Sequence, residues 1–161
     1  MSDTIELTDG AAAVFEDASG FVTAKLAGHW FALPIDAVHE VFNLSRITSV
    51  PLSPPGVIGV LNLRGRIVTA LDTRIILGFP PSGNAPAAAI GVEQDQELYG
   101  LAVDEIGDVL TGSAEDREPA PANLDRRWRD MVTGVQRSND QLVLIVDVAR
   151  LFDNVSALAN A

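Results

Sequence analysis

An internal repeat constrains the fold of this chain more than any other feature. Residues 31–42 match residues 99–110 position by position, with an offset of 68. Residues 59–72 match residues 134–147 in the same way, with an offset of 75. Because paired matches at nearly constant spacing are the signature of one structural unit used twice, we predict two similar units of roughly 70 residues, related by pseudo-symmetry.

The segments inside each copy have the pattern of β-strands. Residues 67–71 and 142–146 are short, rich in β-branched residues and apolar on both faces, as buried strands are. Residues 59–68 predict a hairpin whose turn holds Gly65, since glycine adopts the positive φ that a tight turn requires. The corresponding turn of the second copy is residues 138–140, whose polar residue types favour turns.

Short helices are predicted after both buried strands. In residues 72–78 and 147–152 the apolar spacing changes to a helical one. Asp72 and Asp147 are the expected N-caps, and Gly78 is expected to end the first helix. Both aspartates are therefore interpreted as caps and not as catalytic acids.

Two brief helical turns are also expected, with Asp36 and Asp104 as their caps. Proline- and glycine-rich linkers, such as residues 51–56 and 80–86, are expected between the strands. Short strands without a long helix predict an all-β chain of two small barrels and disfavour a βαβ sheet. A β-sandwich satisfies the same pattern.

Composition excludes several classes of function. With 22 acidic and 11 basic residues the formal net charge is −11, which disfavours binding to nucleic acid or to anionic membranes. There is no cysteine, no apolar run of the roughly 20 residues that a spanning helix needs, and no signal-peptide pattern at the start, so we expect a cytoplasmic protein. His29 and His39 have no ligands at metal-site spacing, and no nucleophile or phosphate-loop motif is present. We therefore expect no metal, no cofactor and no enzymatic activity.

Residues 57–74 resemble the signature of the CheW family of chemotaxis coupling proteins. They contain a Gly-Val pair, an Asn-Leu-Arg-Gly turn, an apolar strand and an Asp-x-Arg motif, in that order. The resemblance continues through residues 33–41, 47–51, 99–104 and 144–151. It implies a CheW-like domain over residues 20–153, with a flexible acidic tail at residues 1–19 and a second tail at residues 154–161.

The resemblance implies an all-β fold of two five-stranded SH3-like barrel subdomains with short helices. It also implies a non-catalytic scaffold that couples the cytoplasmic tips of chemoreceptors, the methyl-accepting proteins, to the regulatory domain of the CheA histidine kinase. Such a protein is recruited to receptor arrays at the membrane and can join other CheW-like domains in rings. By position, the receptor-binding candidates are Val38, Glu40, Gly59, Arg64, Gly100, Ile106 and Val109, and the kinase-binding candidates are Ile47 and Thr48.

A physical interpretation accompanies this assignment. A receptor helix lying in a groove needs an apolar floor, close backbone approach and a polar anchor. The three aliphatic candidates fit the floor or, equally well, a plain core, and Gly59 and Gly100 fit the approach. Arg64, at a turn tip, is the expected anchor, and its side chain is expected to contribute little to the core.

Two alternatives stay open. Residues 28–32 depart from the family pattern, which suggests an adaptor for a non-flagellar system such as pilus motility or second-messenger control. A small β-barrel enzyme is the alternative from another class. The basic segment at residues 126–129 is unassigned and is a candidate for a local contact.

Overall fold

The computed structural model describes residues 3–4, 12–14, 20–83, 86, 88–111, 117–138 and 140–159, which contain twelve strands and four short or medium helices. The strands are β1 (Asp3–Thr4), β2 (Ala12–Val14), β3 (Phe21–Leu26), β4 (His29–Pro34), β5 (Val38–Asn43), β6 (Val57–Leu63), β7 (Arg66–Asp72), β8 (Ala88–Gln94), β9 (Glu97–Val103), β10 (Glu105–Leu110), β11 (Val132–Ser138) and β12 (Gln141–Val146). The helices are the 3-10 helix η1 (Ile35–Ala37), α1 (Thr73–Leu77), α2 (Arg126–Arg129) and α3 (Val148–Ala159).

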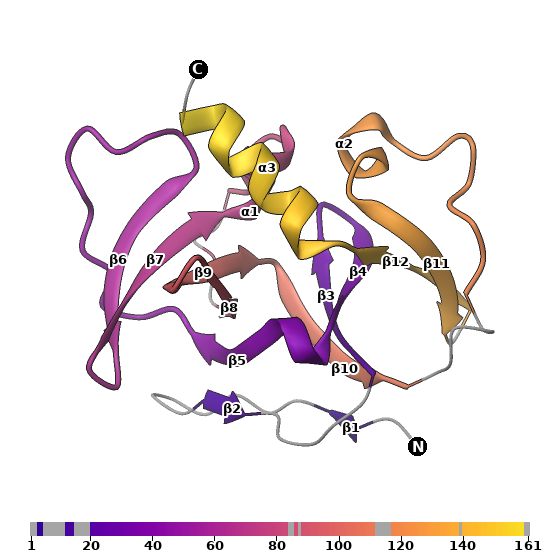
Figure 1. Cartoon of the computed structure of the whole chain (residues 1–161), viewed down its shortest axis with the longest axis horizontal. Helices are drawn as coiled ribbons and strands as arrows, with labels where there is room; N and C mark the ends of the chain where they lie inside the picture. Colours follow the sequence, from indigo (N-terminus) through magenta and orange to yellow (C-terminus); the bar gives the residue numbers. More distant parts are fainter. Residues whose placement is uncertain are drawn as a thin grey trace.

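The described strands form two sheets that lie side by side (Figure 1). One sheet has the order β2-β5-β8-β9-β7-β6 and takes its five main strands from the middle of the chain; we call it the middle sheet. The other has the order β1-β10-β3-β4-β12-β11 and combines strands from both halves of the chain; we call it the split sheet. The predicted all-β chain of two five-stranded units is confirmed, with β1 and β2 added at the sheet edges.

Strand register follows the sequence repeat. In the split sheet β4 pairs in parallel with β12, Phe31 opposite Leu144. In the middle sheet β9 pairs in parallel with β7, Tyr99 opposite Thr69, and these positions differ by the same offsets of 68 and 75. The bulges correspond as well, because the register shifts that begin at residues 57 and 132 are also 75 apart. The predicted pseudo-symmetry is therefore present in the backbone.

The sequence repeat is not, however, the spatial unit. Residues 31–42 begin in β4 of the split sheet and end in β5 of the middle sheet. Residues 99–110 cross in the opposite direction, from β9 to β10. The two copies of the repeat therefore exchange strands. The five main strands of the middle sheet, β5 to β9, are consecutive in the chain, whereas the split sheet combines strands that precede and follow them.

The helices after the buried strands form where they were predicted. The Asp72 carboxylate accepts a hydrogen bond from the Arg74 amide at 3.1 Å, and Gly78 ends α1 at φ 87°. Asp147 accepts one from the Ala149 amide at 2.9 Å. Helix α3 runs to Ala159, well past the predicted end at residue 152.

A brief helical turn, η1, is present at Asp36 as predicted, but neither Asp36 nor Asp104 is a cap, and no helical turn follows Asp104. Asp36 lies inside η1, whose N-cap is Pro34 without a side-chain hydrogen bond. Asp104 is followed directly by strand β10, and its carboxylate binds Arg74. Because the residues after Asp104 are extended and pair with β3, there is no helical turn for its carboxylate to cap.

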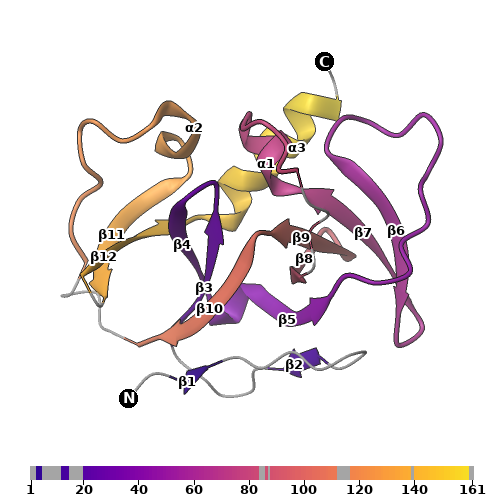
Figure 2. The same cartoon turned by 180° about the vertical axis from the view of Figure 1, so that it is seen from behind.

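The main hydrophobic core lies between the sheets and draws residues from both. Helix α3 extends from the split sheet across to the middle sheet (Figure 2). Helix α3 follows β12 of the split sheet, yet the Phe152 ring lies 5.0 Å from the ring of Tyr99 in the middle sheet. Phe79, just after α1 of the middle sheet, lies 5.9 Å from the ring of Trp128, which also contacts Phe31. Helical segments that follow strands of one sheet thus pack against aromatic side chains of the other sheet.

Parts of the predicted tails take part in this fold. Strand β1 pairs with β10, and β2 pairs with β5. The rest of residues 1–19, and residues 160–161, lie outside the described residues. The domain boundaries at residues 20 and 153 stay a prediction.

Candidate partner-binding site

Arg64 and Glu40 form an ion pair that closes one end of the middle sheet. Arg64 occupies the β6–β7 turn at φ 51°, and the next residue, Gly65, has φ 86°. The guanidinium donates a hydrogen bond to Glu40 Oε2 on β5, although β5 and β6 lie at opposite sides of the sheet order. The sheet must therefore curl until its two sides meet at this pair.

Burial of the two partners is very unequal. The Glu40 side chain is 2% exposed, whereas that of Arg64 is 56% exposed. A buried carboxylate requires a compensating charge, so Arg64 has a structural task in addition to any contact with a partner. The expectation that the Arg64 side chain contributes little to the core agrees with its exposure, but its ion pair with a buried acid could not be read from the sequence.

Gly59 packs against the two kinase-side candidates. A Cβ at Gly59 would overlap the Thr48 carbonyl oxygen and lie 2.7 Å from Ile47 Cγ2. Two hydrogen bonds of 2.8 Å join the backbones of Thr48 and Val60 beside it. Gly59 therefore allows residues 47–48 to add to strand β6, and the structure brings these three candidates together.

Gly100 also serves internal packing. It is buried in β9, where a Cβ would lie 2.8 Å from Cζ of the Phe42 ring. Phe42 belongs to the core inside the middle sheet. At Gly59 and Gly100 the closely approaching atoms seen in the structure belong to this chain, and approach of a partner to these glycines stays a prediction.

The three aliphatic candidates do not line one groove. Val38 is 7% exposed and belongs to the main core. Ile106, its equivalent in the repeat, and Val109 are half-buried against the same core. Val38 borders a hollow with Asp36 and His39, whereas Val109 borders a different one at the end of the split sheet. These three described residues therefore do not form a single apolar floor.

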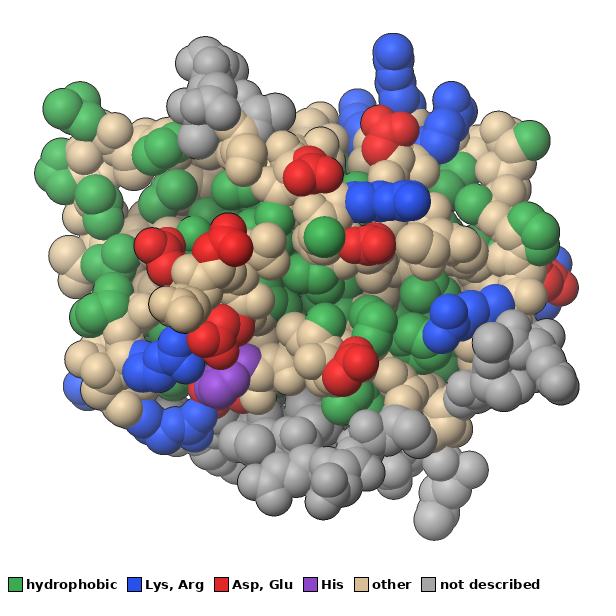
Figure 3. All heavy atoms as spheres, in the orientation of Figure 1, with side chains coloured by type: hydrophobic (Ala, Val, Ile, Leu, Met, Phe, Trp, Pro, Cys, Tyr) green, Lys and Arg blue, Asp and Glu red, His purple; other side chains and the backbone are tan. Residues whose placement is uncertain are grey.

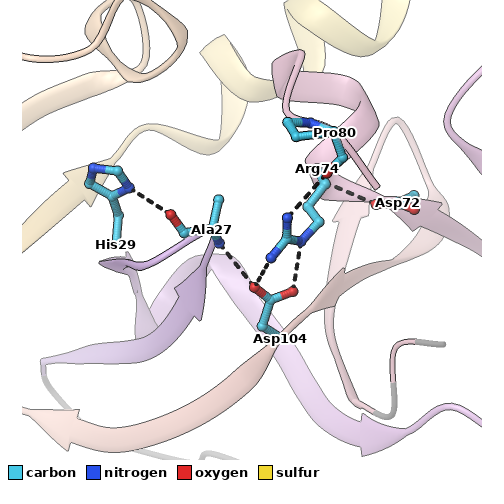
Figure 4. Close-up of polar contacts among 6 residues, drawn as sticks. All are labelled: Ala27, His29, Asp72, Arg74, Pro80 and Asp104. Atoms are coloured by element: carbon cyan, nitrogen blue, oxygen red, sulfur yellow. Dashed lines mark hydrogen bonds and ion pairs between the residues drawn. The ribbon is translucent and has the colours of Figure 1, made fainter. Parts of the chain in front are cut away.

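A second ion pair, not assigned from the sequence, joins the two sheets (Figure 4). Arg74 binds Asp104 with both ends of its guanidinium, Nε to Oδ1 at 3.0 Å and Nη2 to Oδ2 at 2.7 Å. Asp104 also accepts a hydrogen bond from the Ala27 amide at 2.9 Å, and Arg74 donates another to the Pro80 carbonyl oxygen at 3.1 Å. Hydrogen bonding to Arg74 holds the pKa of Asp104 below its usual value. The pair thus fixes α1 to the turn between β3 and β4.

Basic side chains gather in two places on the surface shown in Figure 3. One group lies over α2, where Arg126, Arg127 and Arg129 flank the buried Trp128. Arg127 stacks on Phe79 at 4.6 Å from the ring centroid, so part of this segment serves the packing between the sheets. The other group lies where Figure 1 places the β6–β7 hairpin.

The surroundings of the histidines and the possible metal ligands can also be described. Among the described residues no group of three histidine, cysteine or acidic side chains is arranged to hold a metal. The His29 Nδ1 lies 3.2 Å from the Ala27 carbonyl oxygen, and its ring packs on Trp128. None of the described helices has the length and apolarity needed to cross a membrane.

Comparison with known proteins identifies the family. The model of the CheW-like domain matches residues 20–156. This chain belongs to the CheW-like family. It is 26% identical over 139 residues to a probable chemotaxis protein CheW of Rhizobium etli, covering 86% of this chain and 90% of the relative. It is 27% identical over 137 residues to the chemotaxis protein CheW of Klebsiella aerogenes, covering 83% and 81%.

A solved CheW structure agrees with this CheW-like fold. The scaffolding protein TtCheW of Thermoanaerobacter tengcongensis superposes with a TM-score of 0.71 at 29% identity, over 84% of this chain and 92% of that protein. The predicted family is thereby confirmed. Which residues of this CheW-like chain touch a partner stays a prediction, and the geometry favours Arg64 because its side chain is more than half exposed.

Proposed function

We propose that this CheW-like protein is a non-catalytic adaptor that couples the cytoplasmic tips of chemoreceptors to the regulatory domain of the CheA kinase. The observation that carries the proposal is the CheW-like domain match over residues 20–156. The relatives named above are chemotaxis or scaffolding proteins, which favours neither the non-flagellar adaptor nor the small-barrel enzyme. As an adaptor it acts in the cytoplasm and is recruited to receptor arrays, where other CheW-like domains can join it in rings.

The receptor contact is assigned to the surface around Arg64. Its guanidinium is held at the tip of a tight turn by Glu40, which reduces the entropy lost when a partner binds it. The kinase contact is assigned to residues 47–48, which lie half-buried and exposed along the outer side of β6. The buried candidates Val38, Glu40, Gly59 and Gly100 support these surfaces from beneath.

Binding of the intact protein to two purified fragments tests the proposal. The fragments are a receptor cytoplasmic tip and a CheA regulatory domain, and their dissociation constants are measured by calorimetry. Arg64→Ala is expected to weaken receptor binding at least about tenfold, the effect of losing one charged hydrogen bond, and to leave kinase binding unchanged. Binding to neither fragment would overturn the proposed function.

Arg66→Ala is the matched control. Arg66 lies on the same hairpin and is 44% exposed, but its partner Glu93 is also exposed and lies 3.7 Å away. An exposed ion pair contributes little to stability, so this variant is expected to fold normally. Because neither contact is assigned to Arg66, it is also expected to bind both fragments normally. If both arginine variants lost receptor binding equally, the effect would reflect the charge of the hairpin and not the position of Arg64.

A further inference from the structure

A β-bulge in β5 brings a histidine to the buried acid of the Arg64–Glu40 pair. The register of β5 on β8 shifts by one residue between Val38 and Glu40, so that His39 is the extra residue on the β5 side. In a regular strand consecutive side chains point to opposite faces of the sheet, whereas a bulge re-aims them. The His39 Nε2 accordingly lies 3.6 Å from Glu40 Oε1.

Glu40 therefore has two basic partners among the described residues, one at each carboxylate oxygen. Arg64 donates a hydrogen bond to Oε2, and His39 faces Oε1. The Glu40 side chain is 2% exposed, whereas that of His39 is 40% exposed and can exchange a proton with solvent. A buried carboxylate requires a compensating positive charge. Arg64 carries that charge permanently, and His39 carries it only when both ring nitrogens hold a proton.

Titratable groups from the neighbouring elements also face this histidine. Asp36 of η1 and Glu93 of β8 line one hollow with it, and the start of α3 adds the apolar Val148 and Ala149. On β7, Arg66 lies 3.7 Å from Glu93 and pairs with it. Among the described residues, a protonated imidazole thus has acidic neighbours on η1, β5 and β8, and the basic neighbours belong to the β6–β7 hairpin.

The net charge of the site depends on the imidazole. When His39 is neutral, the charges of Arg64 and Glu40 cancel, and a partner carboxylate meets no net attraction. When His39 is protonated, the three side chains carry one positive charge in all, which attracts such a partner. Histidine is the side chain whose ordinary titration falls between about pH 5 and 8, so both charge states are accessible near neutral pH.

We propose that His39 regulates partner binding at Arg64 by protonation. Its protonated ring shares the compensation of Glu40, and the guanidinium, held in the same place, keeps positive charge for a carboxylate of the receptor tip. This regulation rests on the proposed adaptor function, and it makes coupling stronger as pH falls through the histidine range. At the equivalent position, 68 residues on, the second copy of the repeat has Gly107, which cannot titrate.

The sharing of Glu40 is tested without any partner. Urea unfolding of the wild type, Arg64→Ala, His39→Gln and the double variant is measured at pH 6 and pH 8. With His39 present, Arg64→Ala should raise the unfolding equilibrium constant at least about threefold less at pH 6 than at pH 8, because the protonated ring still compensates Glu40. In the His39→Gln background this difference should disappear. A difference of the same size in that background would come from protonation of Glu40 itself and would overturn the proposal.

Binding of the receptor tip fragment tests the consequence for coupling. Calorimetry at the same two pH values should show the wild type binding about three- to fivefold more tightly at pH 6 than at pH 8. His39→Gln should remove this difference, and His39→Lys, with its permanent charge, should bind as tightly at pH 8 as the wild type does at pH 6. His29→Gln, which removes the other histidine of the chain, is the matched control and should keep the wild-type pH dependence.

Each arm has an outcome that contradicts the regulation. A pH dependence of binding that persists in His39→Gln would show that other groups cause it. Absence of binding at both pH values would overturn the adaptor function and this regulation together. The unfolding cycle needs no receptor, so it distinguishes that outcome from a failure of His39 to compensate Glu40.

Discussion

The stability cost of removing Arg64 follows from the unequal burial of its ion pair. In Arg64→Ala the Glu40 carboxylate, 2% exposed, loses its arginine partner, and the His39 Nε2 stays 3.6 Å from Oε1. Breaking a fully buried pair costs about 3–5 kcal/mol. Because the Arg64 side chain is 56% exposed and water can reach the vacated position, we expect about 1–2 kcal/mol. For a chain of 161 residues this lowers the melting temperature by about 2–8 °C.

A double-mutant cycle separates the charge pair from other effects. Urea unfolding is measured for the wild type, Arg64→Ala, Glu40→Gln and the double variant. In the Glu40→Gln background the arginine has no buried charge to compensate, so its removal is expected to cost less than about 0.5 kcal/mol. The coupling free energy is then about 1 kcal/mol. A coupling near zero, with Arg64→Ala as stable as the wild type, would refute the reasoning from burial.

Two further predictions concern stability. Gly59→Ala should lower the free energy of unfolding by about 1–3 kcal/mol, because its Cβ overlaps the Thr48 carbonyl oxygen; Gly83→Ala, where a Cβ meets nothing within 4 Å, is the control, and equal melting curves for the two variants would contradict this. Asp104 has a pKa lowered by Arg74, so its stabilisation is present above the unfolded-state pKa of about 3.9 and is lost as pH falls through the folded-state pKa. The stability difference between wild type and Asp104→Asn should therefore shrink between pH 6 and pH 2 in urea unfolding, and a constant difference would argue against the pair.

The repeat predicted two similar units related by pseudo-symmetry, but not the pairing of their strands or the exchange of strands between them. The offsets of the repeat show which segments are alike. They are the same whether each sheet is built from one copy of the repeat or the two copies exchange strands. The choice is made by long-range pairing, such as Phe31 with Leu144, which leaves no local signal in either strand. Asp104 shows the same limit, because its resemblance to a cap is local and its arginine partner lies 30 residues away.

The residues of the candidate site could be selected from the sequence, but their contacts with one another could not. Arg64 and Glu40 were both selected through the family resemblance, but their mutual contact was not, since they lie on strands at opposite sides of a sheet that must curl to join them. The two glycines were recognised as positions of close approach. Which atoms approach them depends on the packing of Thr48 and Phe42, and a sequence pattern does not contain that information.

Strand exchange also sets the order in which this chain can fold during synthesis. Strands β3 and β4 leave the ribosome early, yet β4 is covered only when β12 arrives, Trp30 meeting Val143. At about 5–20 residues per second the interval is on the order of ten seconds. Because loop closure over such separations is entropically slow, the nascent hairpin exposes apolar residues such as Phe31 and Leu33 throughout that time. A shortened chain that ends before β12 is therefore expected to depend on chaperones, since β4 lacks its neighbour β12.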